Sequence, residues 1–200
     1  MQNQIKSALL MNDNYYDVTV FGYSNHGIPG VEIVGLGTDG RIIKEKIIYL
    51  IRAKALGVPK KRIVIGVDID GEINKKISYE PLELPIFITF LTLSGHLKTN
   101  ALNNCFSIGG LSTLGKYNSR FFNKSLSNFL DRKVQDEEKL CLIAPSNFYA
   151  NSCNFKIDID EFLSNIQKID SPVNSLGFSS PINLSTVGAT SFNANFDSIS

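Results

Sequence analysis

Three phrases decide the fold that this sequence predicts: Gly27-Ile28-Pro29-Gly30-Val31-Glu32-Ile33-Val34-Gly35-Leu36, Arg62-Ile63-Val64-Ile65-Gly66-Val67 and Leu82-Glu83-Leu84-Pro85-Ile86. The first predicts a tight glycine turn that leads into a strand, because β-branched residues follow the turn residues. The second is a nearly continuous apolar run of strand length, typical of a central strand covered on both faces. The third predicts a helix with proline in its first turn, where a missing N–H costs nothing.

The hydrophobic pattern on either side of these phrases predicts further elements. Residues 17–21 alternate valine with threonine, and we expect them to pair antiparallel with residues 31–34. Residues 41–56 carry apolar side chains at spacings of three and four, which predicts an amphipathic helix, whereas residues 84–94 are apolar all round, which predicts a buried one. This order indicates an α+β or α/β layered fold with a mixed sheet. The later predicted elements are strands at 105–108, 111–117 and 140–144 and helices at 123–132 and 158–169.

Length and composition bound the class of protein. With 200 residues, 43% of them hydrophobic, the chain can bury an ordinary core, and we expect one domain over residues 1–170. Residues 171–200 are rich in serine and asparagine and carry a single charge, which predicts a flexible linker or tail. No apolar run approaches the roughly 20 residues that span a bilayer, and residues 1–11 have too short an apolar patch for a signal peptide. We therefore expect a cytoplasmic protein with no membrane partner.

Charge is unevenly distributed along the chain, although the formal net charge is only +1. Between Arg41 and Arg62, eight basic residues stand against one acidic residue, Glu45. Clustered lysine and arginine neutralise phosphates and give sequence-independent, salt-sensitive binding. The pattern therefore predicts DNA as a partner, with a solvated helix face as the alternative explanation. The predicted DNA-binding residues are Lys44, Lys46, Arg52, Lys54, Lys60, Lys61 and Arg62.

Several motifs that could carry chemistry each lack one indispensable group. Residues 110–116 have the Gly-x4-Gly-Lys spacing of a phosphate-binding loop, but Tyr117 stands where serine or threonine should hold magnesium, so we predict a β-hairpin. The carboxylates of residues 68–72 do not complete a calcium loop and fit a polar turn. His26 and His96 are the two histidines, and neither has an obvious catalytic partner in the sequence. We therefore predict no catalytic residue, no metal or nucleotide site and no cofactor.

The three opening phrases resemble the N-terminal domain of the magnesium-chelatase-like competence ATPases, the ComM family, over about residues 1–150. The resemblance is carried most strongly by Gly35-Leu36, by Arg62 at the start of the central strand and by Leu84-Pro85-Ile86 at the start of the buried helix. The family usually has proline, aspartate, alanine and glutamate at four positions where this chain differs, namely Gly37, Glu83, Phe87 and Gly110.

The resemblance implies a particular fold, and it raises the question of whether the domain has the serine/lysine dyad of a protease. The family's ChlI-like domain is similar in fold to the proteolytic domain of Lon-type proteases and to the second domain of ribosomal protein S5, so we expect an α+β fold of that kind. Alignment of the buried helix puts Leu82 where the protease has its nucleophilic serine, while Lys124 falls near the protease's lysine. The resemblance therefore implies a non-proteolytic domain. The alternatives are a Lon-like serine/lysine peptidase remnant that uses Ser78 and Lys124, or a small nucleotide-binding protein that depends on Lys116.

The resemblance also implies a biological setting. In the family, the complete protein is a hexameric ATPase that acts on DNA during natural transformation and recombination, by branch migration, and a later AAA+ module binds ATP. Residues 195–199 resemble the phrase just before that module, so we expect a domain of a larger protein or a truncated gene. The implied role is that of a non-catalytic N-terminal domain in assembly or DNA contact. Its expected partners are DNA, further copies of itself or an AAA+ ATPase module.

Overall fold

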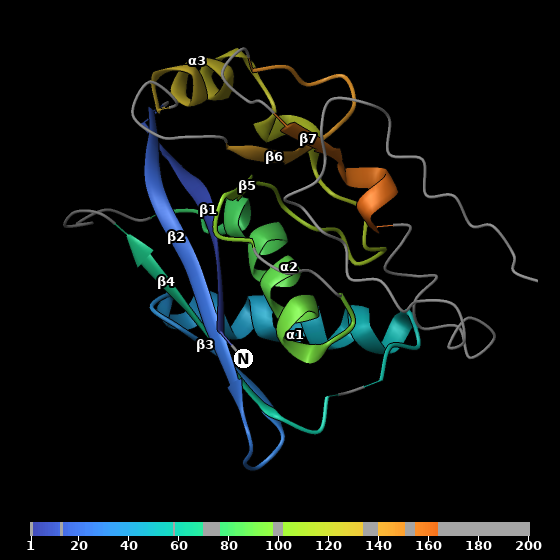
Figure 1. The fold of residues 1–200 in the computed structure, drawn as a ribbon. Coiled ribbons are helices and arrows are strands. Elements are labelled where there is room, and N and C mark those ends of the chain that lie inside the picture. Colours follow the sequence, from blue (N-terminus) through green and yellow to red (C-terminus); the bar gives the residue numbers. More distant parts are fainter. Residues whose placement is uncertain are drawn as a thin grey trace, which may run out of the picture.

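The computed structural model describes residues 2–12, 14–57, 59–69, 77–97, 102–133, 140–150 and 155–163. Within these residues the chain forms a seven-stranded mixed sheet with helices packed against it (Figure 1). The predicted α+β class is therefore confirmed. The elements in chain order are β1 (Gln2–Met11), β2 (Asn14–Asn25), β3 (Gly30–Val34), α1 (Gly37–Ala53), β4 (Arg62–Ile69), η1 (Glu80–Leu82), α2 (Glu83–Ser94), β5 (Cys105–Ser107), η2 (Ser119–Phe121), α3 (Lys124–Lys133), β6 (Cys141–Ala144) and β7 (Phe155–Asp158).

The order of the strands is β3-β4-β2-β1-β5-β6-β7, and it corrects one expectation. The antiparallel pairing of residues 17–21 with residues 31–34 is wrong, because β4 lies between β2 and β3. β4 pairs antiparallel with β2 and parallel with β3. The apolar side chains of β4 are buried most completely when the strand lies inside the sheet, with a neighbouring strand on each edge. The connection at residues 26–29 is long enough to carry the chain across the width of that inserted strand.

Two strands go beyond what the sequence pattern predicts. β1 pairs with β2 along its whole length as an antiparallel hairpin. Its alternating polar and apolar residues place Ile5 in the core and leave Gln4 exposed. β7 pairs parallel with β6. The carboxylate of Asp158, at the end of β7, accepts the backbone N–H groups of Asp160 and Glu161 at 2.9 and 3.0 Å, as an acid at a helix start does.

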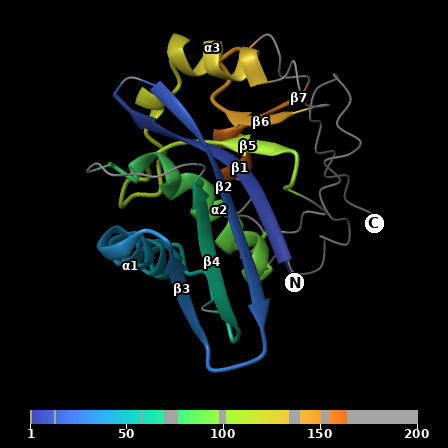
Figure 2. The same ribbon diagram turned by 90° about the vertical axis from the view of Figure 1, so that its left-hand side faces the viewer.

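The helices divide between the two faces of the sheet (Figures 1 and 2). Alternate residues of β1 mark the two sides: Ile5 and Leu9 belong to the core beneath α1 and α2, whereas Ala8 belongs to a second core with Leu126 and Leu130 of α3. α1 and α2 therefore cover one face of the sheet, and α3 covers part of the other. Residues 164–170 of the predicted domain, and the predicted tail at 171–200, lie outside the described residues.

α2 is the buried helix that its apolar sequence predicts. Its side chains are buried from Glu83 to Leu93, and it ends at Gly95 in the left-handed conformation, with φ of 86°. The buried hydroxyls of Thr89 and Thr92 donate to backbone carbonyls one turn earlier, at 2.9 and 3.0 Å, so they carry no unpaired donor into the core. Among the described residues, no helix combines the length and the apolar composition that crossing a bilayer would need.

Gly35 joins β3 to α1 at a point where no larger residue fits. Its φ is +90°, and a Cβ there would lie 2.9 Å from the carbonyl oxygen of Val67 in β4. Gly37 also has positive φ, +54°, but a Cβ there would meet nothing within 4 Å. Alanine substitutions at the two glycines therefore distinguish the free-energy cost of positive φ from the additional cost of a steric clash.

We expect Gly35→Ala to destabilise the fold by about 2–4 kcal/mol, because it adds a clash to the conformational cost, and Gly37→Ala by only about 1 kcal/mol. Urea unfolding of the two variants and the wild type measures the difference. Equal losses of stability would show that the approach of Gly35 to β4 does not constrain the fold.

Candidate nucleic-acid interface

A cleft of about 600 Å³ opens between the β2–β3 turn and α1. Three segments far apart in the sequence line it: His26 comes from the turn, Lys44 and Ile48 from α1, and Arg62 from the start of β4. Ile28, which also lines the cleft, is 89% exposed. The fold therefore brings together two of the predicted DNA-binding residues, Lys44 and Arg62, with a histidine that the charge pattern did not single out.

Strand register explains why these residues meet. Gly30 pairs with Arg62 across β3 and β4, and the N–H of Gly30 donates to the carbonyl oxygen of Lys61 at 3.2 Å. The β2–β3 turn is thereby fixed against the start of β4. No spacing in the sequence connects His26 to Arg62, so sequence reasoning had no signal for including the histidine.

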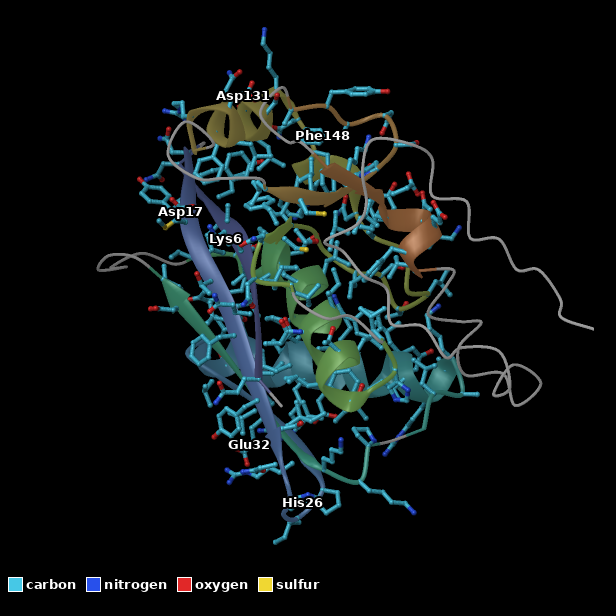
Figure 3. All side chains as sticks on the ribbon, in the orientation of Figure 1. Lys6, Asp17, His26, Glu32, Asp131 and Phe148 are labelled. Atoms are coloured by element: carbon cyan, nitrogen blue, oxygen red, sulfur yellow. The ribbon has the colours of Figure 1, made fainter. Side chains whose placement is uncertain are left out.

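Arg62 forms an ion pair with Glu32 of the neighbouring strand β3. Its Nε and Nη2 atoms lie 3.3 and 3.1 Å from Oε1 of Glu32, and Nη2 lies 2.9 Å from Oε2. Hydrogen bonds from Arg62 lower the pKa of the Glu32 carboxyl, with a smaller contribution from the charge of Lys44, and the same bonds raise the pKa of Arg62. Both side chains are about half exposed, so solvent screens the pair and it contributes little to stability. Figure 3 shows Glu32 above His26 at this end of the sheet.

Three further predicted cations extend the charge of the cleft. Arg52 lies one helical turn beyond Ile48 on α1, and Lys60 and Lys61 directly precede Arg62; all three cations are exposed. Lys54 is half-buried, and its side chain lies against the turn at Gly115. Its Nζ is 3.0 Å from the position that a Cβ would occupy if residue 115 had one. We call the surface formed by Lys44, Arg52, Lys60, Lys61 and Arg62 the basic strip.

Lys46 occupies a different place, inside the fold. Its Nζ donates to Oε1 of Glu83 at 2.5 Å and to the carbonyl oxygen of Leu111 at 2.9 Å. The other carboxylate oxygen of Glu83 accepts the N–H of Leu111 at 2.7 Å. The Glu83 side chain is 8% exposed and that of Lys46 25%. These contacts tie α1 to α2 and to the loop at Leu111, so Lys46 is not part of the basic strip.

Residues 110–116 form a turn rather than a phosphate-binding loop. An isolated antiparallel bridge joins Leu111 to Tyr117. The N–H groups of Ser112 and Gly115 donate to the carbonyl oxygens of Lys116 and Ser112, at 2.8 and 2.9 Å, and the N–H of Lys116 donates to the Ser112 hydroxyl at 3.1 Å. A phosphate cradle needs such N–H groups free. The predicted reversal of the chain is therefore present, but it is closed by the single bridge between Leu111 and Tyr117, and the strand predicted over residues 111–117 is not formed.

The structure does not bring the residues of the peptidase alternative together as a hydrogen-bonded dyad. Leu82 is fully buried, and Lys124 is exposed at the start of α3. Ser78 lines a second cleft, of about 570 Å³, and its Oγ accepts the N–H of Glu80 at 3.4 Å. Among the described residues that line this cleft, the lysine is Lys46, and its Nζ is bound by the carboxylate of Glu83 rather than by the Ser78 hydroxyl.

The acidic cluster at residues 68–72 offers no metal site in the described part of the chain. Asp68 is exposed on β4, and residues 70–72 lie outside the described residues. Nowhere among the described residues do three histidine, cysteine, aspartate or glutamate side chains converge as a metal ion would require.

Comparisons with known proteins give no match: no family model fits the chain, and no curated protein sequence is significantly similar to it. A function for the chain therefore has to be inferred from the fold and from the basic strip.

We expect Lys46→Met to destabilise the protein by about 2–4 kcal/mol, because it leaves the buried Glu83 carboxylate without its cation. Lys44→Met, two residues away on the same helix, should change stability by no more than about 0.5 kcal/mol, because its ion pair with Glu45 is long, at 3.9 Å, and Glu45 is largely exposed.

Adding Glu83→Gln to Lys46→Met should recover part of the loss, since glutamine carries no charge and still accepts the N–H of Leu111. Urea unfolding of the three variants measures these effects. If Lys46→Met proves as stable as Lys44→Met, the buried ion pair does not hold α1 in place.

Proposed function

We propose that this chain is a non-catalytic DNA-contacting domain, of the kind found at the N-terminus of magnesium-chelatase-like, ComM-type AAA+ proteins, with a Lon-protease-like fold. The observation that supports this proposal is the basic strip. Its five cations come from a helix, a loop and a strand: Lys44 and Arg62 line one open cleft together with His26, Arg52 lies on the same helix as Lys44, and Lys60 and Lys61 directly precede Arg62. In this proposal the chain works in the cytoplasm during recombination, beside an AAA+ module that supplies ATP hydrolysis.

The chemistry of the strip suits a polyanion rather than a small charged metabolite. Its lysines and arginines stand on separate elements, with Lys60 and Lys61 exposed to solvent beside β4. Within the described residues, the hydrogen bonds of Arg62 to Glu32 use Nε and Nη2 and leave Nη1 without an acceptor. Neutralising five phosphates would make binding fall with salt at a logarithmic slope of about −4 to −5.

The phrases that carry the family resemblance lie where the chain changes direction. Gly35-Leu36 joins β3 to α1, Arg62 opens β4, and Pro85 lies in the first turn of α2. Residues at such junctions are constrained by backbone geometry, which supports a shared fold as the source of the resemblance. The peptidase and nucleotide-binding alternatives lack such support, because no described lysine is hydrogen-bonded to Ser78 and residues 110–116 form a turn.

We expect the double variant Lys60→Glu/Lys61→Glu to weaken DNA binding at least about tenfold, uniformly across sequences, and to reduce the salt slope by about 2. Fluorescence anisotropy with labelled single-stranded and branched DNA, at about 50 and 200 mM salt, measures both effects. Lys124→Glu/Arg132→Glu on α3 is the matched control, since it makes the same change in net charge away from the cleft.

The proposal fails if the wild-type chain shows no salt-dependent association with either DNA. It also fails if the α3 control loses as much affinity as the Lys60/Lys61 variant, because the binding would then follow net charge rather than the basic strip.

A further inference from the structure

One part of the sheet has no described helix over it. On the face of the sheet opposite α1 and α2, α3 packs against Ala8, Tyr15 and Phe106. These three residues lie at one end of β1 and β2. Toward the other end, β4, β2 and β1 face the viewer in Figure 2, with α2 behind them and α1 to the left of β4. We call this uncovered region of β3, β4, β2 and β1 the open patch.

Strand register gathers apolar side chains at the centre of the open patch. Phe21 of β2 is paired with Gly66 of β4, which is paired with Val34 of β3. In the adjacent row, Tyr23 is paired with Val64. Phe21, Tyr23 and Val34 are 41%, 38% and 46% exposed, so a large share of their apolar surface faces solvent. The amides of Gln2 and Gln4 on β1 border this centre.

The Phe21 ring is already held in position. A Cβ on Gly66 would overlap the ring, so the absence of a side chain at Gly66 lets the ring lie against the sheet. One face of the ring is thus covered by backbone and the other is left exposed. A partner that packs on it would pay little conformational entropy, because the ring is already ordered.

The charges around the open patch cancel. Within the four paired rows of the patch, Arg62 and Lys6 carry the positive charges and Glu32 and Asp68 the negative ones, while Asp17 lies one row further toward α3; Figure 3 shows Lys6 and Glu32 toward opposite ends of this region. Arg62 and Glu32 already form an ion pair within the chain. A neutral patch has no net attraction for a polyanion, in contrast to the basic strip, and it can face an identical patch without net repulsion.

We propose that the open patch is a self-association surface through which two copies of this chain pack face to face, sheet against sheet. An apolar centre with a polar, charge-balanced border is the usual anatomy of a protein interface. The patch is four strands wide, which gives about 15 Å, and three two-residue spacings long, which gives about 20 Å. Its area is therefore about 300 Å² per copy. Because stable complexes bury about 800 Å² per partner, we expect a weak, concentration-dependent dimer.

Sedimentation velocity of the full chain without DNA, from low micromolar to near-millimolar concentration, tests this proposal. We expect the weight-average mass to rise toward that of two chains. Added salt should leave the association unchanged or strengthen it, because apolar burial drives it, whereas salt weakens DNA binding. The experiment is thus independent of the proposed function, and either proposal can fail alone.

Two variants and one control locate the surface. Val34→Lys places a charge in the patch at an edge-strand position, and Phe21→Ser removes the central ring; each should weaken self-association at least about tenfold. Tyr49→Ser on α1 removes an aromatic side chain that is 56% exposed on a different surface and should associate like the wild type. Thermal unfolding of each variant checks that it is folded, and Val34→Lys keeps the test valid if Phe21→Ser does not fold.

The proposal is overturned if the wild type stays monomeric at the highest concentration. It is equally overturned if folded Val34→Lys associates as strongly as the wild type, or if Tyr49→Ser is the variant that dissociates.

Discussion

β4 lies between two strands that precede it in the chain, and its burial there is the constraint on which both proposed surfaces depend. Ile63 and Ile65 are fully buried against the helices, and Val64 is 8% exposed on the other face. With those residues fixed, the pairing of β4 with β3 and β2 sets Arg62 beside Glu32 and Gly66 beneath Phe21. A shift of one residue would turn the apolar side chains outward and remove both the cleft and the open patch.

The position of α1 depends on a second, polar constraint. The Lys46–Glu83 pair, with the backbone of Leu111, joins α1 to α2 and to the turn that follows β5. A buried ion pair is costly unless every polar atom finds a partner, and here both carboxylate oxygens do. The pair therefore favours one placement of α1 over others that apolar packing alone would tolerate. That placement carries Lys44 to the cleft.

The two proposed surfaces adjoin at Arg62, which lines the cleft and borders the open patch. A face-to-face dimer would therefore carry two basic strips in one assembly. Two linked sites bind a long polymer more tightly than either site does alone, because the second contact becomes intramolecular. Weak self-association and weak DNA contact would then reinforce each other, which fits the DNA-contacting role that we propose.

The sequence by itself determined those features that depend on neighbouring residues. The buried strand at Arg62–Val67, the proline-opened helix α2 and the turn at 110–116 follow from local hydrophobic periodicity and turn chemistry. β1 was missed because its half-exposed pattern, with few β-branched residues, carries only a weak strand signal. Tertiary structure alone decided which strands are neighbours, that Lys46 is bound inside by Glu83 while Lys44 is not, and that His26 lines the same cleft as Arg62. The physical reason is that pairing, burial and ion-pair formation join residues far apart in the chain, and their energies depend on distances that only the folded backbone sets.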